Sequence, residues 1–72
     1  MARENILNFY HQIIGSIETL PDGSKIARDF YGKQLGRFDA KTGVTKDFYG
    51  KILSKGDITS ALVWQEYNEH PF

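Results

Sequence analysis

The sequence predicts an all-β fold, an antiparallel meander of three short hairpin repeats followed by a C-terminal capping segment. The first observation is a repeat: DFYGKQLGRFD at residues 29–39 returns as DFYGKILSKGD at residues 47–57, and NFYHQIIGSIE at residues 8–18 aligns with both. The second is that all seven glycines lie between Gly15 and Gly56. The third is that segments between the turn signals are too short for helices.

The aligned copies share one motif, N/D-F-Y-G/H-x-x-I/L-G/S-x-x-D/E. Its first position holds Asn8, Asp29 and Asp47, and its aromatic pair is Phe9-Tyr10, Phe30-Tyr31 and Phe48-Tyr49. A repeat of this size is one supersecondary unit that packs against its copies. We therefore divide the single domain into units of about 8–28, 29–46 and 47–57, with a C-terminal cap over 58–70.

Each motif position has a role in a turn. Asp or Asn at the first position bonds the backbone two residues on, and glycine at the fourth supplies a positive φ. This predicts a type I turn followed by a left-handed residue, the common three-residue hairpin loop. His11 replaces that glycine in the first copy, and histidine is one of the few other residues enriched at positive φ. LPDGS at 20–24 and DAKTG at 39–43 are further turn signatures.

The first segment is compatible with two structures. Residues 3–14 contain no glycine or proline, and Ile6, Tyr10, Ile13 and Ile14 form a stripe at helical spacing. The repeat alignment instead predicts a hairpin here, because three motif features agree. We expect the hairpin and keep the helix as the alternative.

The C-terminal segment differs from the repeats. Asp57 is a candidate N-cap, the next thirteen residues lack glycine and proline, and Pro71 would end a helix. Leu62, Val63 and Tyr67 would then face the sheet. The stretch ITSALVW is also acceptable as a strand. We expect a short helix that covers one open end of the sheet.

Composition narrows the classes of protein. The 72 residues contain no cysteine, which excludes disulfides and thiolate metal sites and favours a reducing, cytoplasmic setting. The start, MARENILNFYHQ, lacks the apolar run of a signal peptide, and no segment is long and apolar enough to span a membrane. Net charge is zero, although residues 24–55 hold eight cations against three carboxylates, which is 8 − 3 = +5.

The stretch RDFYGKQLGRFDAKTGVTKDFYGKILSKGD resembles small uncharacterised bacterial proteins built from D-x-Y-G-K/R-x-x-G hairpin repeats. It is more distantly similar to β-flower proteins and YD-type repeats. The resemblance covers about residues 6–64 and consists mostly of turn residues. It implies an all-β repeat fold and no assigned activity. The sequence departs from the pattern at His11, at Gly56 and in the irregular spacing of its repeats.

Candidate catalytic residues are few. His11 and His70 show no triad or metal-binding arrangement, and both are interpreted as loop residues. Four aspartates, Asp29, Asp39, Asp47 and Asp57, are explained by turn formation more simply than by acid–base chemistry. No phosphate-binding loop occurs, because the glycines are spaced as turn residues. We therefore expect no enzymatic activity, no cofactor and no metal site.

The aromatic turns have two interpretations. Residues at the apex of a tight turn are normally polar, yet here each apex is Phe-Tyr. Neighbouring repeats could fold over the rings and make them part of a small core. Alternatively, Phe30, Tyr31, Phe48 and Tyr49 are displayed as a binding surface, since clustered exposed apolar groups usually mark an interaction site. We expect Trp64 to pack under the C-terminal segment.

The basic residues also repeat. Lys33 and Lys51 follow the turn glycine in the two later copies, and Arg37 and Lys55 stand four residues on. Residues i and i+4 of a strand share a face, which predicts a basic stripe of these four residues. The stripe is either a solvated strand face, on which lysine blocks edge pairing, or a site for an anionic partner.

These observations lead to a non-enzymatic binding module whose partner is another protein or a second copy of the chain. Such a partner would also protect the open sheet edges that a short meander leaves. The alternative is a single-stranded nucleic-acid-binding module that combines basic residues with stacking rings. Zero net charge and the lack of a known recognition motif count against this alternative.

Overall fold

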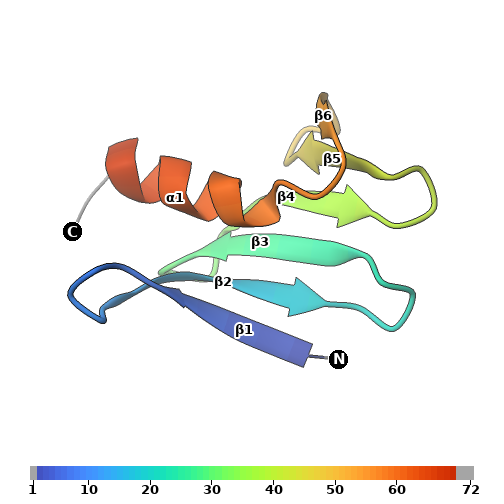
Figure 1. Ribbon diagram of the computed structural model, residues 1–72. Helices are drawn as coiled ribbons and strands as arrows, with labels where there is room; N and C mark the ends of the chain where they lie inside the picture. Colours follow the sequence, from blue (N-terminus) through green and yellow to red (C-terminus); the bar gives the residue numbers. More distant parts are fainter. Residues whose placement is uncertain (1, 70–72) are drawn as a thin grey trace.

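The computed structural model describes residues 2–69, which form a six-stranded antiparallel sheet and one helix (Figure 1). The elements are β1 Ala2–Leu7, β2 Ile13–Thr19, β3 Lys25–Asp29, β4 Gln34–Asp39, β5 Val44–Asp47, β6 Ile52–Lys55 and α1 Thr59–Glu69. The strand order in the sheet is β1-β2-β3-β4-β5-β6, so each strand pairs with the strands next to it in the sequence. The all-β meander with a C-terminal helix is therefore confirmed.

The three motif copies form the turns of three hairpins, β1–β2, β3–β4 and β5–β6. Each hairpin therefore joins the strand before the motif to the strand inside it. The helical alternative for residues 3–14 is wrong, because Ala2–Leu7 is a strand paired with β2. The stripe at helical spacing arises because the chain reverses direction within it: Ile6 precedes the turn, Tyr10 lies in it, and Ile13 and Ile14 follow it.

Each hairpin contains a β-bulge at the same motif position. Ile6 pairs with Gly15 and Leu7 with Ile13, which leaves Ile14 as the extra residue. In the other two hairpins the register changes in the same way. The extra residues are Ile14, Leu35 and Leu53, which are the aligned I/L of the motif. A bulge of this kind bends the strand and redirects side chains after the turn.

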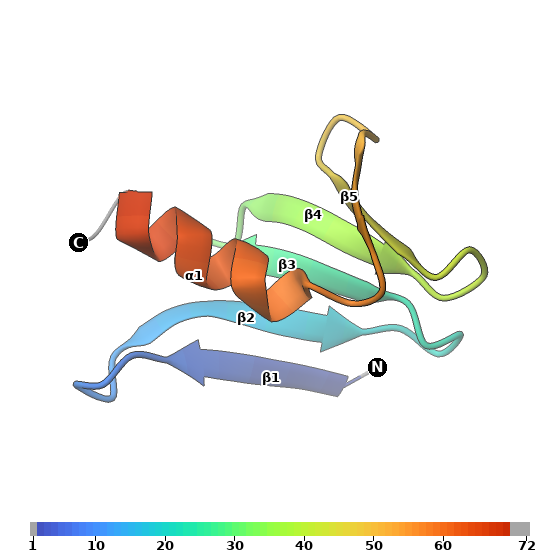
Figure 2. The ribbon, with the colours of Figure 1, turned by 45° about the horizontal axis from the view of Figure 1, so that its top comes forward.

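The helix lies across one face of the sheet, over β2, β3 and β4, rather than over an open end as expected (Figure 2). Its residue Val63 is completely buried, while Leu62 and Tyr67 pack beside it against the core. The three residues expected to face the sheet therefore do so. The strand alternative for ITSALVW is wrong. Pro71 and His70 lie outside the described residues.

Asp57 stabilises the start of the helix but lies one residue before the N-cap position that the sequence predicts for it, because the carbonyl of Ile58 accepts the first helical hydrogen bond, from the N–H of Leu62. Its carboxylate accepts hydrogen bonds from the backbone N–H and the hydroxyl of Thr59, at 3.0 and 2.6 Å, and forms a 2.8 Å salt bridge with Lys25. Burial by itself raises the pKa of the Asp57 carboxyl, but the bonds from Lys25 and Thr59 outweigh burial and hold that pKa below its ordinary value. The charged form of Asp57 therefore favours the folded state.

Two glycines lie in strands under the helix, a placement that the turn interpretation of the glycines missed. A Cβ at Gly15 would stand 2.5 Å from Cγ1 of Val63, and a Cβ at Gly36 would stand 2.8 Å from Cδ1 of Leu62. Neither distance is compatible with an unmoved neighbour. The absence of side chains at these positions is what allows α1 to approach the sheet closely.

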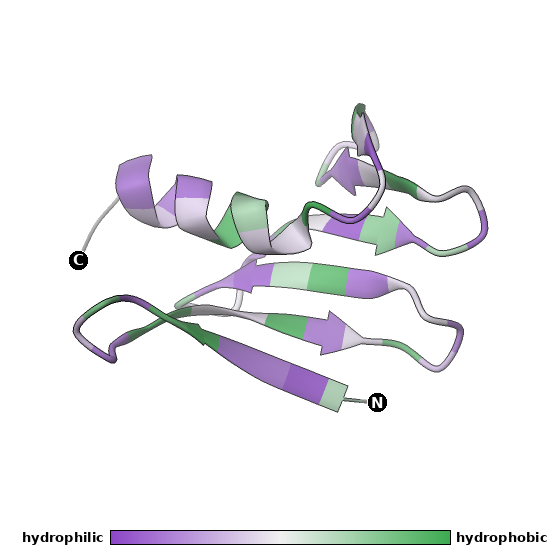
Figure 3. Cartoon of the chain, viewed as in Figure 1, coloured by the Kyte–Doolittle hydropathy of each residue, from purple (hydrophilic) through white to green (hydrophobic). Residues whose placement is uncertain are grey.

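The core is small and lies between α1 and the sheet. Its buried members are Ile14, Ile17, Ala27 and Val63. Apolar segments alternate with polar ones along the strands (Figure 3), as expected for a sheet packed on one side only. Within residues 2–69, no second layer covers the opposite face of the sheet, which we call the open face.

Candidate interaction site at the aromatic turns

The three aromatic turns have the same backbone structure. In the second turn, the Asp29 carboxylate accepts hydrogen bonds from the backbone N–H groups of Tyr31 and Lys33, at 2.9 and 2.8 Å. Asn8 and Asp47 make the equivalent pairs of bonds in the first and third turns. The fourth motif position has a positive φ of 61° at His11 and 85° at Gly32 and Gly50. The predicted three-residue hairpin loop is therefore confirmed.

The Phe-Tyr pairs at these turns are exposed. Tyr31 and Tyr49 are 82% and 90% accessible, and Phe9 is 93% accessible. The interpretation in which neighbouring repeats fold over these rings is therefore wrong for the single chain. The reason is geometric, because a three-residue loop projects its apex beyond the end of the sheet, where α1 does not reach every turn. The rings stand as an exposed row.

Within the second and third turns, the two rings of each pair contact one another. Phe30 and Tyr31 meet edge to face with centroids 5.2 Å apart, and Phe48 and Tyr49 do so at 5.5 Å. Such edge-to-face contacts between aromatic rings are favourable. The two later turns thus present similar apolar tips.

The first turn is tied to the helix instead. The amide of Asn8 donates hydrogen bonds to the Tyr67 hydroxyl at 3.1 Å and to the Gln12 side chain at 2.9 Å. A carboxylate at position 8 has no N–H to donate, which explains why this copy carries Asn where the others carry Asp. Phe9 lies 6.3 Å from Trp64, ring to ring, and Trp64 packs against the core as expected.

The four basic residues of the predicted stripe do not share one face. Arg37 pairs with Ile26 and Gln34 with Arg28, so residues 34 and 37 lie on the same face although they are three apart. The bulge at Leu35 causes this change of period, and it places Lys33 on the side opposite to Arg37. The bulge at Leu53 separates Lys51 from Lys55 in the same way. The predicted basic stripe is therefore wrong, because i and i+4 share a face only in an unbroken strand.

The structure instead gathers cations on the open face. Arg37 and Lys46 are direct cross-strand partners, and Lys55 lies on the same face of β6, opposite Val44. Lys33 and Lys51 stay at the aromatic turns, where both are exposed. The four cations of the predicted stripe thus separate: Arg37 and Lys55 lie on the open face beside Lys46, and Lys33 and Lys51 form a turn group.

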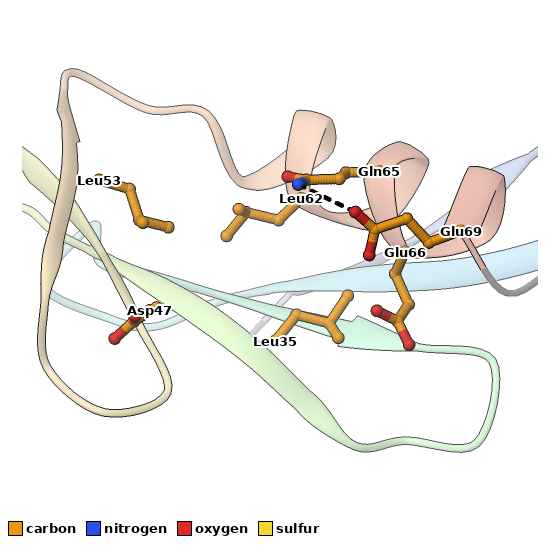
Figure 4. Close-up of a pocket in the computed structure, with 7 residues that line it drawn as sticks. All are labelled: Leu35, Asp47, Leu53, Leu62, Gln65, Glu66 and Glu69. Carbon is orange, nitrogen blue, oxygen red and sulfur yellow. Dashed lines mark hydrogen bonds between the residues drawn. The ribbon is translucent and has the colours of Figure 1, made fainter.

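A groove of about 230 Å³ opens beside the turns, between α1 and strands β4 to β6 (Figure 4). Its floor is apolar: the side chains of Leu53 and Leu62 point toward each other, and Leu35 lies below them. Its rim carries the carboxylates Asp47, Glu66 and Glu69. We call it the turn groove. Sequence reasoning missed it, although two glutamates in the last turn of a predicted helix are an available signal, because acidic groups are unfavourable there.

The part of the chain that the structure describes, residues 2–69, brings no three metal-binding side chains of the His, Cys, Asp or Glu type together. It also includes no helix with the length and apolar character needed to cross a membrane.

The described structure is thus a helix-covered antiparallel meander with aromatic turns and an apolar, acid-rimmed groove at one end. No protein-family model, curated protein or solved structure matches the chain. The resemblance to hairpin-repeat proteins stays a prediction.

Proposed function

We propose that this chain is a small non-enzymatic binding module that holds a protein partner at its aromatic turn end. One observation carries the proposal: three identically built turns expose Phe-Tyr pairs where turns normally carry polar residues. Exposed aromatic side chains are the residues that most often dominate binding energy at protein interfaces. The cytoplasmic setting expected from the cysteine-free composition is part of this proposal.

The test compares the wild type with the double variant Tyr31→Ser, Tyr49→Ser. Both rings are exposed, so their loss should leave stability nearly unchanged. Self-association is measured by sedimentation velocity, and partners are recovered from cell extract and quantified by mass spectrometry. We expect the variant to lose the association that the wild type shows.

A matched control changes exposed apex residues at the other end of the sheet, Pro21→Ser with Lys41→Ser. This control should associate as the wild type does. The proposal fails if the tyrosine variant and the wild type sediment alike and recover the same proteins in the same amounts.

A second candidate function rests on the open face. Like charges directly opposite one another destabilise a sheet, and Arg37 faces Lys46 across β4 and β5. An anionic partner, such as single-stranded nucleic acid, would relieve that repulsion. The triple variant Arg37→Gln, Lys46→Gln, Lys55→Gln should then abolish binding of a fluorescent oligothymidine, whereas Lys33→Gln with Lys51→Gln should retain it. Binding that does not weaken as salt is raised would contradict this candidate.

A further inference from the structure

We propose that the turn groove is filled by a Phe-Tyr-Gly-Lys turn of a second copy of this chain, so that two copies pair through their turn ends. The inference rests on the proposed function, because it names the protein that the aromatic turns bind. It depends on three properties of the groove, which are its size, its lining and its position.

The size of the groove favours a side chain from a protein over a small-molecule ligand. Ligand pockets commonly enclose about 300–1,000 Å³, whereas this groove encloses about 230 Å³ and is open to solvent. A space below that range is better matched to a side chain at the tip of a turn than to an enclosed ligand. The tip of an aromatic turn offers a ring together with a cation, since Tyr31 and Lys33 are separated by a single glycine.

The lining matches the turn in polarity and in charge. The leucine floor suits a ring, and the rim carries three carboxylates, Asp47, Glu66 and Glu69. Within residues 2–69 the two salt bridges are Lys25–Asp57 and Arg28–Glu18, so no rim carboxylate is paired with a cation in that part of the chain. The same holds for the exposed turn lysines, Lys33 and Lys51.

The rim also has an electrostatic reason to attract a cation. Glu66 and Glu69 lie in the last turn of α1, which contains no basic residue. The helix macrodipole places partial negative charge at this end, which opposes the charge of both glutamates, and Glu69 is offset only by a 3.4 Å hydrogen bond from the Gln65 amide. A lysine from a second copy would complete the last turn in the way that a C-terminal lysine does in many helices.

The position of the groove allows both copies to bind at once. Asp47 belongs to the third turn and also to the groove rim, and Leu35 follows the second turn directly. Turn and groove therefore lie at the same end of the molecule (Figure 4). Two copies related by a twofold axis can each offer a turn and receive one, which closes the assembly as a dimer instead of a fibre.

The experiment uses two charge-reversed variants of the full chain. The groove variant is Glu66→Lys with Glu69→Lys, and the turn variant is Lys33→Glu with Lys51→Glu. Each variant alone places like charges in both contacts, so each should associate at least about tenfold more weakly than the wild type. In an equal mixture, the lysine turns of the groove variant meet native carboxylates, and the glutamate turns of the turn variant meet the new lysines. The mixture should therefore recover the dimer mass by sedimentation velocity.

The controls separate dissociation from unfolding. The groove variant should melt no lower than the wild type monomer, because it moves positive charge to the helix C-terminus. The variant Lys41→Glu with Lys55→Glu makes the same charge change as the turn variant but away from the three aromatic turns, and it should still form the dimer.

Three results would overturn the inference: a monomeric wild type over the whole concentration series, a mixture that stays monomeric while the wild type pairs, or charge-reversed variants that pair normally. Association that is lost in the tyrosine variant but unaffected by charge reversal overturns the groove and leaves the proposed function standing. Wild-type partners that survive the tyrosine change overturn the proposed function itself.

Discussion

The centre of the sheet and its turn end differ in the size of their side chains. Under α1 stand the smallest residues of the chain, Gly15, Ala27 and Gly36. At the turn tips stand the largest exposed ones, with Phe9, Tyr31 and Tyr49 each more than four-fifths accessible. Globular proteins usually bury their large apolar side chains. The small central residues are required by the packing of the helix, so the question is what the large terminal ones are required for.

The loops at the other end of the sheet can be compared with the aromatic turns. There the turns use Pro21, Asp22 and Gly23 or Lys41 and its neighbours, and their tips are small or polar. The two loops are joined by Ser24, whose hydroxyl donates to Asp22 and accepts from the backbone N–H of Ala40. Good turns are thus made in this protein without aromatic tips. The fold does not need the Phe-Tyr pairs at these turns, and this is the physical reason for the binding role that we propose for them.

The largest expected effect on the free energy of unfolding comes from a substitution at the centre of the sheet, under α1. Gly15→Ala puts a Cβ 2.5 Å from both Cγ1 of Val63 and the backbone oxygen of Arg28, so the helix or the strand must shift. Overpacking of this kind costs about 1–3 kcal/mol in the free energy of unfolding. In a chain of 72 residues that is a large share of the total stability. Urea unfolding followed by circular dichroism measures it.

Ser54→Thr is the matched control, because it also adds one carbon at the same motif position, in β6, away from β2, β3 and β4 on which α1 packs. It should change the free energy of unfolding by less than about 0.5 kcal/mol. Equal effects at positions 15 and 54 would show that the helix does not set the size limit.

The next effect removes the carboxylate that precedes the helix and depends on pH. Asp57→Ala should cost about 0.5–1.5 kcal/mol at neutral pH, because it removes the acceptor of two hydrogen bonds from Thr59 and the salt-bridge partner of Lys25. The folded-state pKa of Asp57 is below its ordinary value of 3.8, so its contribution is present above that pH and is lost as pH falls through the folded pKa. The stability gap between wild type and variant should therefore narrow in acid. A gap that is constant down to pH 2 would contradict the assignment.

A smaller difference in stability is expected between substitutions at two residues of the second turn. Asp29→Ala removes the acceptor of two backbone N–H groups and should cost about 1 kcal/mol. Tyr31→Ser, two residues away, removes an exposed ring and should change stability by less than about 0.5 kcal/mol. Thermal melting of the two single variants measures the difference. A larger loss for the tyrosine would mean that the rings stabilise the fold, and the contrast with the centre would disappear.

The hairpins were predictable because their information is local. An Asx residue, a glycine three positions on and a repeat at spacings of 21 and 18 determine the turns wherever the chain goes afterwards. The bulges were not predictable from the same motif, because the extra residue is defined only by pairing with the other strand. That single register change separated Lys33 from Arg37 and moved the basic residues to two different places.

The glycines under the helix and the turn groove were missed for a related reason. From the sequence alone, Gly15 and Gly36 are interpreted as turn residues. Their packing role depends on α1, a segment distant in sequence that lies on them. The groove is formed by residues from three parts of the chain, among them Leu35, Leu53 and Leu62. Contacts between segments far apart in sequence leave no local pattern to read, whereas the exposed tips of the site were visible as an anomaly in turn composition.

The smallest expected effect on stability comes from a substitution that gives the first turn the same glycine as the other two. His11 is the only non-glycine residue within residues 2–69 with a positive φ, 61°, while its counterparts Gly32 and Gly50 stand at 85°. A left-handed conformation costs an L-residue about 1–2 kcal/mol, and glycine returns about 0.5–1 kcal/mol of this through the entropy of the unfolded chain. His11→Gly should therefore raise the free energy of unfolding by about 0.5 kcal/mol, measured by urea unfolding. Gly32→His is the reverse exchange and should lower it by a similar amount. If instead both substitutions lower stability, the contact of Asn8 with Tyr67 of α1 fixes the first turn in a conformation that histidine suits better than glycine. The three turns would then share their backbone hydrogen bonds but not their preference at the fourth motif position.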